Sequence, residues 1–372
     1  MAVGCSARRA GRATARRSQS GYREAINVRV FNCPACSARL FFVSHECSCG
    51  QRVAYDLEKD AMVPLEMRCG HRETIACNWA PSFDASGFTS GTGLCRSCAL
   101  TEVVPDLQLD ANVAHWQETE RAKRWVLANL ARWGWFADCD LGARPIFQLL
   151  SEQVATGAQH VSMGHQNGVI TINVSEADAA LRTWRSQSFD EPLRTMIAHM
   201  RHELAHFIFL ERLSHNTEFL EAFRQLFGDE TTNYGAALDA YHAAGARPDW
   251  SSFFISAYAS SHPQEDWAET AAHVLHLVDI LDSFNQVGLQ MTHSDLDDSE
   301  PGGQLPQREG AYEMRDADAL FAQAAAVSIA VNHLNRSIGV PDIYPFVLNP
   351  NVREKLAFAH KWISRGPGEF DC

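Results

Sequence analysis

The sequence contains no apolar run that approaches the roughly 18 residues a membrane-spanning helix needs. The first residues also lack the apolar core of a secretory signal, although they include Arg8-Arg9 and Arg16-Arg17. Both absences predict a cytoplasmic protein that does not bind a membrane. Residues 1–26 contain six arginines and one glutamate. We interpret them as a disordered basic tail, and a transit peptide is the alternative that this composition also fits.

Basic residues are scarce outside that tail. The chain has 32 lysines and arginines against 45 aspartates and glutamates, which gives a formal net charge of −13. The tail contributes +5, so the rest of the chain carries about −18. Nucleic-acid binding depends on basic patches, and this composition therefore argues against nucleic acid as the main partner. With 372 residues, 46% of them apolar, the chain can form a small module and one larger domain with a full core.

Cysteine is almost absent outside one region. Eight of the 11 cysteines lie between residues 33 and 98, and the others are Cys5, Cys139 and Cys372. In a chain without a secretory signal, such clustering indicates metal binding and not disulfides. We expect structural zinc at one or both of two sets of four cysteines. The first set is Cys33, Cys36, Cys47 and Cys49, and the second is Cys69, Cys77, Cys95 and Cys98.

The spacing within these sets leaves alternatives open. Cys47-x-Cys49 is one residue shorter than the usual Cys-x2-Cys pair, and seven residues separate Cys69 from Cys77. His45 in the first set or His71 in the second could therefore replace one sulfur. Reduced, buried cysteines that behave as small apolar residues are the plainer interpretation.

A His-Glu-x-x-His motif, residues 202–206, lies in an apolar run with helical periodicity from about residue 193 to 213. On a helix, His202 and His206 share one face and can offer two imidazole nitrogens to a single Zn²⁺. Glu203 would then act as general base on the water that zinc activates. Asp190-Glu191-Pro192 is predicted to cap and start the helix. We interpret His199, one turn earlier, as a supporting or core residue.

Short motifs also arise by chance, so this interpretation requires a third ligand. We expect it in a helix that starts at Pro263, where Glu265 and Glu269 share one face. We predict that Glu265 binds zinc and that Glu269 accepts a hydrogen bond from a ligand histidine. The spacing alone leaves the reverse assignment open, and two helix glutamates without a role are the plainer alternative. His273 is interpreted as a hydrogen-bonded core histidine.

The segment from Tyr258 to Glu269 has the pattern Tyr-x6-Glu-x3-Glu, which resembles the lethal-factor-like branch of gluzincins. More broadly, residues 28 to 362 resemble a bacterial family of zinc-binding metallopeptidases with an N-terminal zinc ribbon. The resemblance implies a zincin fold and peptidase chemistry. The residues that carry it are Cys33–Cys36, Ala76–Trp79, Cys95–Cys98, Pro105–Leu107, Ala122–Arg124, Gly168–Asn173, the HELAH motif, Glu265–Thr270 and Asn335–Gly339.

Periodicity predicts the remaining elements. Helices are expected at about 114–133, 217–226, 232–244, 316–337 and 351–364, and strands at 28–31, 40–43, 145–150 and 169–174. We expect Val169–Val174 to be an edge strand that pairs with extended substrate, although an internal strand has the same pattern. The 58 residues between His206 and Glu265 are expected to shape the substrate cleft, and Thr292–Gly310 to be a mobile loop.

These observations predict an α+β protein. A mainly helical, zincin-like metallopeptidase domain with a small mixed sheet (105–372) would follow a zinc-ribbon module (27–104). The expected function is hydrolysis of a protein or peptide substrate, with one catalytic zinc on His202, His206 and Glu265. Tyr258 would donate a hydrogen bond to the oxyanion of the transition state. The alternative is a non-catalytic protein-binding module in which all zinc is structural.

Overall fold

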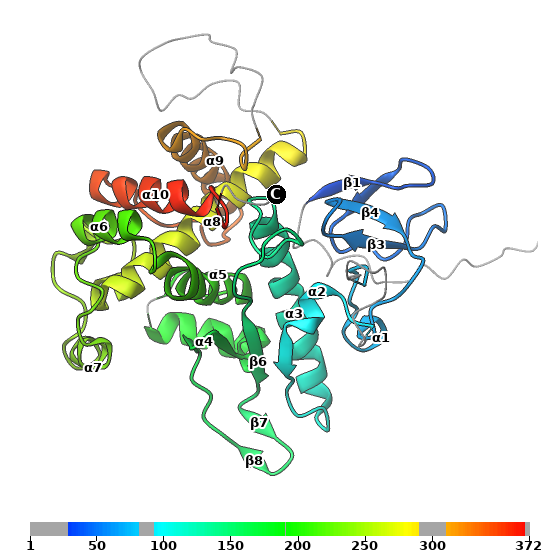
Figure 1. Ribbon diagram of the computed structural model, residues 1–372, viewed down its shortest axis with the longest axis horizontal. Coiled ribbons are helices and arrows are strands. Elements are labelled where there is room, and N and C mark those ends of the chain that lie inside the picture. Colours follow the sequence, from blue (N-terminus) through cyan, green and yellow to red (C-terminus); the bar gives the residue numbers. More distant parts are fainter. Residues whose placement is uncertain (1–28, 82–92, 190, 290–309, 369–372) are drawn as a thin grey trace, which may run out of the picture.

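The computed structural model describes residues 29–81, 93–189, 191–289 and 310–368. The predicted basic tail and nearly all of the predicted 292–310 loop lie outside the described residues. Helices dominate the described chain and the strands form small sheets, so the predicted α+β class is confirmed (Figure 1). Within these ranges, no helix combines the length and the apolar character that crossing a membrane requires.

Most of the predicted helices and strands form close to their expected limits, and the structure adds several short elements. The helices are α1 (Arg72–Ile75), α2 (Arg96–Ala99), α3 (Asp110–Ala131), α4 (Ala179–Phe189), α5 (Met196–Phe207), α6 (Thr217–Leu226), α7 (Tyr234–Ala244), α8 (Pro263–Gln286), α9 (Ala317–Ser337) and α10 (Pro350–Ile363). Short helical turns are η1 (Val174–Ala177), the π-helical η2 (Ile208–Leu213), η3 (Trp250–Ser252) and η4 (Tyr258–Ser261). The strands are β1 (Val30–Asn32), β2 (Arg39–Phe41), β3 (Val53–Asp56), β4 (Ala61–Pro64), β5 (Thr101–Val103), β6 (Ile146–Leu150), β7 (Gln153–Val154), β8 (Gly157–Ala158), β9 (Gly164–Gln166) and β10 (Val169–Asn173).

Helix α3 lies between the cysteine-rich N-terminal part and the helices that carry the histidines and glutamates, and it contacts both (Figure 1). The ring of Phe42 lies 5.0 Å from that of Trp125 on α3, in an edge-to-face contact. The indole N–H of Trp125 donates to Asp279 on α8 at 2.7 Å, and Arg201 of α5 donates to the same carboxylate at 2.5 Å. Residues from both parts belong to one apolar cluster, so they share a core.

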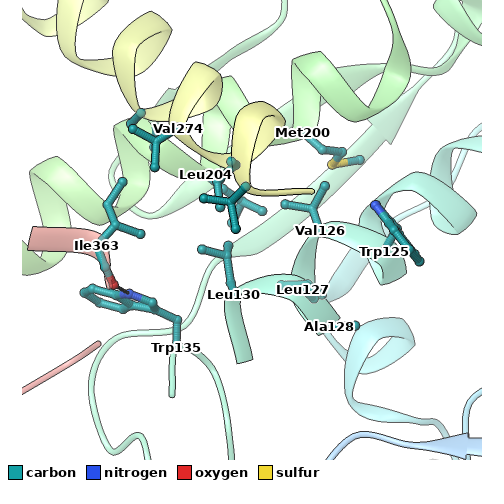
Figure 2. Packing of buried hydrophobic residues seen from close by; sticks show 14 of the residues in the cluster. Trp125, Val126, Leu127, Ala128, Leu130, Trp135, Met200, Leu204, Val274 and Ile363 are labelled. Carbon is teal, nitrogen blue, oxygen red and sulfur yellow. Dashed lines mark hydrogen bonds between the residues drawn. The ribbon is translucent and has the colours of Figure 1, made fainter. Parts of the chain in front are cut away.

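The two helices of the predicted metal site are fixed by this core. Leu204 of α5 is fully buried, and Figure 2 shows it with Met200 directed toward Val126 and Leu130 of α3. The indole N–H of Trp267 on α8 donates to the backbone carbonyl of Ala205 at 2.9 Å. Burial of one such leucine contributes roughly 1.5–3 kcal/mol, so apolar packing below α5 holds its polar face in place.

The start of α5 differs from the prediction. The helix begins at Met196, and Thr195 caps it by accepting a hydrogen bond from the Ala198 N–H at 3.0 Å. The predicted cap at Asp190-Glu191-Pro192 is therefore wrong, and residue 190 itself lies outside the described residues. A guanidinium nitrogen (Nη2) of the intervening Arg194 lies 2.7 Å from Oε1 of the buried Glu176, and this ion pair favours a position of the stretch outside the helix. The helix carries the histidines as expected, but it is about a turn shorter.

The main sheet also corrects an expectation. Its strand order is β5-β6-β10-β9, in which β10 runs parallel to β6 and antiparallel to β9. Asn167 and Gly168 both have positive φ, at 51° and 78°, and form a two-residue turn that folds β9 back onto β10. Strand β10 (Val169–Asn173) is therefore internal, and the predicted edge position is wrong. Strand β9 lies at that edge of the sheet.

Candidate metal centre

Helices α5 and α8 bring His202, His206 and Glu265 together. Nε2 of His202 lies 3.1 Å from Nε2 of His206, and Glu265 Oε2 lies 3.1 Å and 3.4 Å from these two nitrogens. Zinc–ligand bonds of about 2.0–2.1 Å in tetrahedral geometry place neighbouring ligand atoms about 3.3 Å apart. The three atoms therefore have the separations of three corners of a zinc tetrahedron.

The chemistry of this donor set also fits a cation. The Oε2 atom of Glu265 is buried and has no hydrogen-bond partner among the described residues. An ionised carboxylate oxygen without a partner is costly to bury, and a metal ion would remove that cost. The Oε2 atom of Glu203 is in the same condition, and burial raises the pKa of the Glu203 carboxyl. The buried Oε2 of Glu265, unpartnered in the described part of the chain and beside two histidine nitrogens, therefore fits a site for a cation.

Glu269 lies one turn beyond Glu265 on α8 and contacts the other side of the His202 ring. Its Oε1 atom is 2.8 Å from Nδ1 of His202, and its Oε2 atom accepts a hydrogen bond from the Ser256 hydroxyl at 2.7 Å. Since the carboxylate accepts, Nδ1 carries the proton and Nε2 of His202 presents its lone pair toward His206 and Glu265. The arrangement fixes both the tautomer and the orientation of the ring.

A tyrosine that the sequence did not indicate completes the surroundings of Glu265. The Tyr234 hydroxyl, at the first residue of α7, donates a hydrogen bond to Oε1 of Glu265. Ser256 is likewise a residue that sequence reasoning missed. Tyr234 and Ser256 lie 31 and 13 residues before their partner carboxylates, and no local pattern marks either of them.

The predicted catalytic residues line one cavity of about 460 Å³ beside the three candidate metal ligands. Glu203 and Tyr258 both belong to its wall, and the Tyr258 ring lies 6.2 Å from that of His202. Burial, and then the charge of Glu265, raise the pKa of the Tyr258 hydroxyl, so it remains a hydrogen-bond donor near neutral pH. His199 and His273 also line the cavity, outside the group of three metal-ligating side chains.

The two histidines within α8 contact polar side chains of the protein. Nδ1 of His273 lies 2.8 Å from the Tyr344 hydroxyl, in line with the expectation of a hydrogen-bonded core histidine. Nδ1 of His276 lies 2.6 Å from a guanidinium nitrogen of Arg201. Burial lowers the pKa of His273 to about 4, and burial together with Arg201 also lowers that of His276, so both rings are neutral near pH 7.

The eight clustered cysteines form the two predicted sets of four. In the first set, Cys33 and Cys49 are separated by 3.8 Å and Cys36 and Cys47 by 3.6 Å, measured between sulfurs. Sulfurs on a tetrahedral zinc with bonds of about 2.3 Å are about 3.8 Å apart. These distances fit zinc without a contribution from His45, which is not among the four grouped side chains.

The second set is deeply buried against α3. The sulfur of Cys77 lies 3.6 Å from that of Cys95 and 3.7 Å from that of Cys98, and Cys69 completes the group. All four side chains are buried. His71 instead packs its ring on Trp116 at 5.1 Å, outside this group.

Comparisons with known proteins find one matching family and several similar chains. A family model described as "Putative zinc-binding metallo-peptidase" matches residues 112–362, which include the histidine motif and both glutamates of α8. The chain is 34% identical over 355 residues to the uncharacterized proteins Rv2568c of Mycobacterium tuberculosis and Mb2598c of Mycobacterium bovis. Each alignment covers 92% of this chain and 98% of the relative. No solved structure matches the chain.

Proposed function

Because the chain belongs to this family of zinc-binding metallo-peptidases, we propose that it hydrolyses peptide bonds as a zinc-dependent hydrolase of the gluzincin type. The observation that carries this proposal is the triangle formed by His202, His206 and Glu265, with Glu203 beside it on the wall of a cavity. A closed structural zinc site has four protein ligands, whereas a catalytic site keeps one position open. The group of ligating side chains in the described structure has three members here, which favours catalysis.

Zinc held by these three residues would act as a Lewis acid and lower the pKa of a water molecule toward neutrality. Glu203 would accept the proton of that water as its oxygen bonds to the carbonyl carbon of the substrate. The same carboxyl would then return the proton to the nitrogen as the C–N bond breaks. Its raised pKa and its position on the cavity wall support both roles.

Tyr258 is the proposed donor to the oxyanion that develops during the attack. Its side chain lines the cavity, and the hydroxyl stays protonated near neutral pH because its pKa is raised. Tyr234 suits this role less well, because its hydroxyl already donates to Glu265 and its side chain is not among those that line the cavity.

Strand β9 is the proposed docking strand for extended substrate. Its antiparallel partner is β10, and no other described strand pairs with its outer edge. Met163, the residue just before β9, lines the cavity, so the strand adjoins the site. An extended peptide can add to such an edge through backbone hydrogen bonds, and side-chain pockets would then set the specificity.

The two sets of four cysteines are proposed to be closed structural zinc sites within residues 27–104. They would stabilise a region of short strands and helices, because zinc binding contributes directly to folding where little apolar surface can be buried. The alternative function, a zinc-stabilised module that binds a protein without cleaving it, would require the cavity to hold a partner segment unchanged.

One experiment separates the two functions. Zinc-loaded protein is incubated with a diverse library of proteome-derived peptides, and the products are identified by mass spectrometry. We expect cleavage that a chelator abolishes and added zinc restores. If no peptide is cleaved while elemental analysis shows that the chain holds the zinc ion that Glu265→Ala removes, the binding module replaces the hydrolase.

A further inference from the structure

We propose that Tyr234 is a positioning residue that holds the Glu265 carboxylate in its metal-binding orientation and thereby couples helix α7 to the metal. This inference rests on the proposed metal site. It concerns a residue 24 positions before Tyr258, on an element that the sequence indicated only as a wall of the cleft.

The first argument is that the two oxygens of Glu265 have different surroundings. Oε1 accepts the hydrogen bond from Tyr234, whereas Oε2 lacks a partner in the described chain and faces the two histidine nitrogens. A hydrogen bond to one oxygen limits rotation of the carboxylate about its last torsion. The other oxygen then stays directed at the metal, and carboxylate ligands in proteins are commonly supported in this way.

The second argument is the strength of the bond. A hydroxyl that donates to an ionised carboxylate forms a charge-assisted hydrogen bond, about twice as strong as a neutral one. Loss of this bond would leave Oε1 of a 1% exposed glutamate without its donor.

The third argument is the weak attachment of α7 to the rest of the molecule. None of its residues from Tyr234 to Ala244 is buried, and Figure 1 places the helix at the periphery. Its first residue is nevertheless tied to the start of α8, because the Tyr234 ring packs on His262 at 5.1 Å. His262 caps α8 by accepting from the Gln264 N–H at 3.0 Å.

A helix with so little buried surface has low local stability, and each additional anchor should order it measurably. If zinc fixes Glu265 and Glu265 accepts from Tyr234, zinc binding should protect α7. By the reciprocity of coupled equilibria, the attachment of α7 should also raise the affinity for zinc.

The matched control is Tyr241, on the same helix. It lines the cavity and its ring lies 5.7 Å from that of Tyr258, but no hydrogen bond of its hydroxyl occurs among the described residues. Tyr234→Phe and Tyr241→Phe therefore each remove one phenolic hydroxyl from the same helix. Only Tyr234→Phe also removes a contact with a proposed metal ligand. The whole Tyr234 residue is 40% exposed, so loss of its hydroxyl should leave the fold intact.

The test measures zinc affinity in the full chain by competition with chelators of graded strength, and Glu265→Ala identifies which zinc belongs to this site. We expect Tyr234→Phe to lower the affinity for this zinc by about 10–100-fold and Tyr241→Phe to leave that affinity unchanged. We also expect zinc to slow hydrogen exchange of residues 234–244 in the wild type and in Tyr241→Phe, and to slow it far less in Tyr234→Phe. Exchange in α3 and α10 reports whether each variant is folded.

Equal zinc affinity and equal zinc-dependent protection in both variants would overturn the inference. Failure of the proposed function looks different. If Glu265→Ala leaves every zinc in place, the metal site itself is misassigned, whatever Tyr234→Phe does.

Discussion

Glu269 Oε1 lies 2.8 Å from Nδ1 of His202, while Nε2 of the same ring lies 3.1 Å from Oε2 of Glu265. The two carboxylates, one helical turn apart on α8, thus contact opposite nitrogens of one imidazole. The first can keep Nδ1 protonated, so that Nε2 is left with a lone pair for a metal ion. This relationship supports different proposed roles for two glutamates that spacing alone could not distinguish.

The two glutamates are predicted to differ in their effect on zinc affinity. Glu265→Ala removes a ligand and should empty or greatly weaken the site. Glu269→Ala removes only support for the His202 ring and should cost about 10–100-fold in zinc affinity or activity. Chelator competition on the full chain measures both. Loss of the metal in Glu269→Ala, with normal binding in Glu265→Ala, would reverse the assignment.

The cysteine sets predict the total zinc content. Two sets of four thiolates and one site with two histidines and a carboxylate imply about three zinc ions per chain. Cys36→Ser and Cys98→Ser should each remove one ion by elemental analysis. Cys98 is fully buried beside α3, whereas Cys36 is exposed, so Cys98→Ser should also lower the thermal midpoint more. A total of one zinc per wild-type chain would eliminate both cysteine sites.

Tyr258→Phe tests the proposed oxyanion donor. Removal of the hydroxyl should lower kcat by about 10²-fold, in the range seen when one oxyanion donor is lost, while KM changes little. Tyr241→Phe removes a hydroxyl from the ring that packs on Tyr258, serves as the control and should lose far less activity. Equal losses in the two variants would contradict the oxyanion role of the Tyr258 hydroxyl.

His360 on α10 should make the protein sensitive to acid. Its ring is buried between Trp133 and Phe321, and burial followed by the charge of Arg315 lowers its pKa to about 4. In the unfolded chain the pKa is about 6.5, so the unfolded state takes up the proton first as the pH falls. The stabilising contribution is complete above pH ~6.5 and is lost between there and pH ~4.

His360→Phe removes this titration and keeps an apolar ring. Between pH 7.5 and 5, the free energy of unfolding in urea should therefore fall by about 2 kcal/mol more in the wild type than in the variant. Loss of zinc in acid affects both proteins equally and cancels in the difference. Parallel losses would show that His360 titrates normally in the native state.

The helices of the metal site could be predicted because their signals are local. Pro263 starts α8 as expected. Helical spacing placed His202 and His206 on one face of α5, and Glu265 and Glu269 on one face of α8. The start of α5 was misplaced because the competing signal is tertiary. Arg194 pairs with Glu176, which lies 18 residues away, and Thr195 takes over the cap.

The edge strand was misassigned for a different reason. Asn167-Gly168 is a strong hairpin signal, but the residues before it, Gly164–Gln166, have too little apolar character to be recognised as a strand. Tyr234 and Ser256 could not be predicted, because a hydrogen bond across 31 or 13 residues has no period and no motif. Sequence patterns thus identified the proposed ligands, whereas the residues that support them depend on the folded structure.

The most direct test of the hydrolase is the comparison of wild type with Glu203→Gln on one peptide that the wild type cleaves. Because glutamine keeps the shape and removes the base, zinc content and melting temperature should be unchanged, while kcat falls by several orders of magnitude. Glu218→Gln, the same change at an exposed position on α6, should cleave at the wild-type rate. A zinc-loaded, folded Glu203→Gln that cleaves as fast as the wild type would rule out Glu203 as the general base.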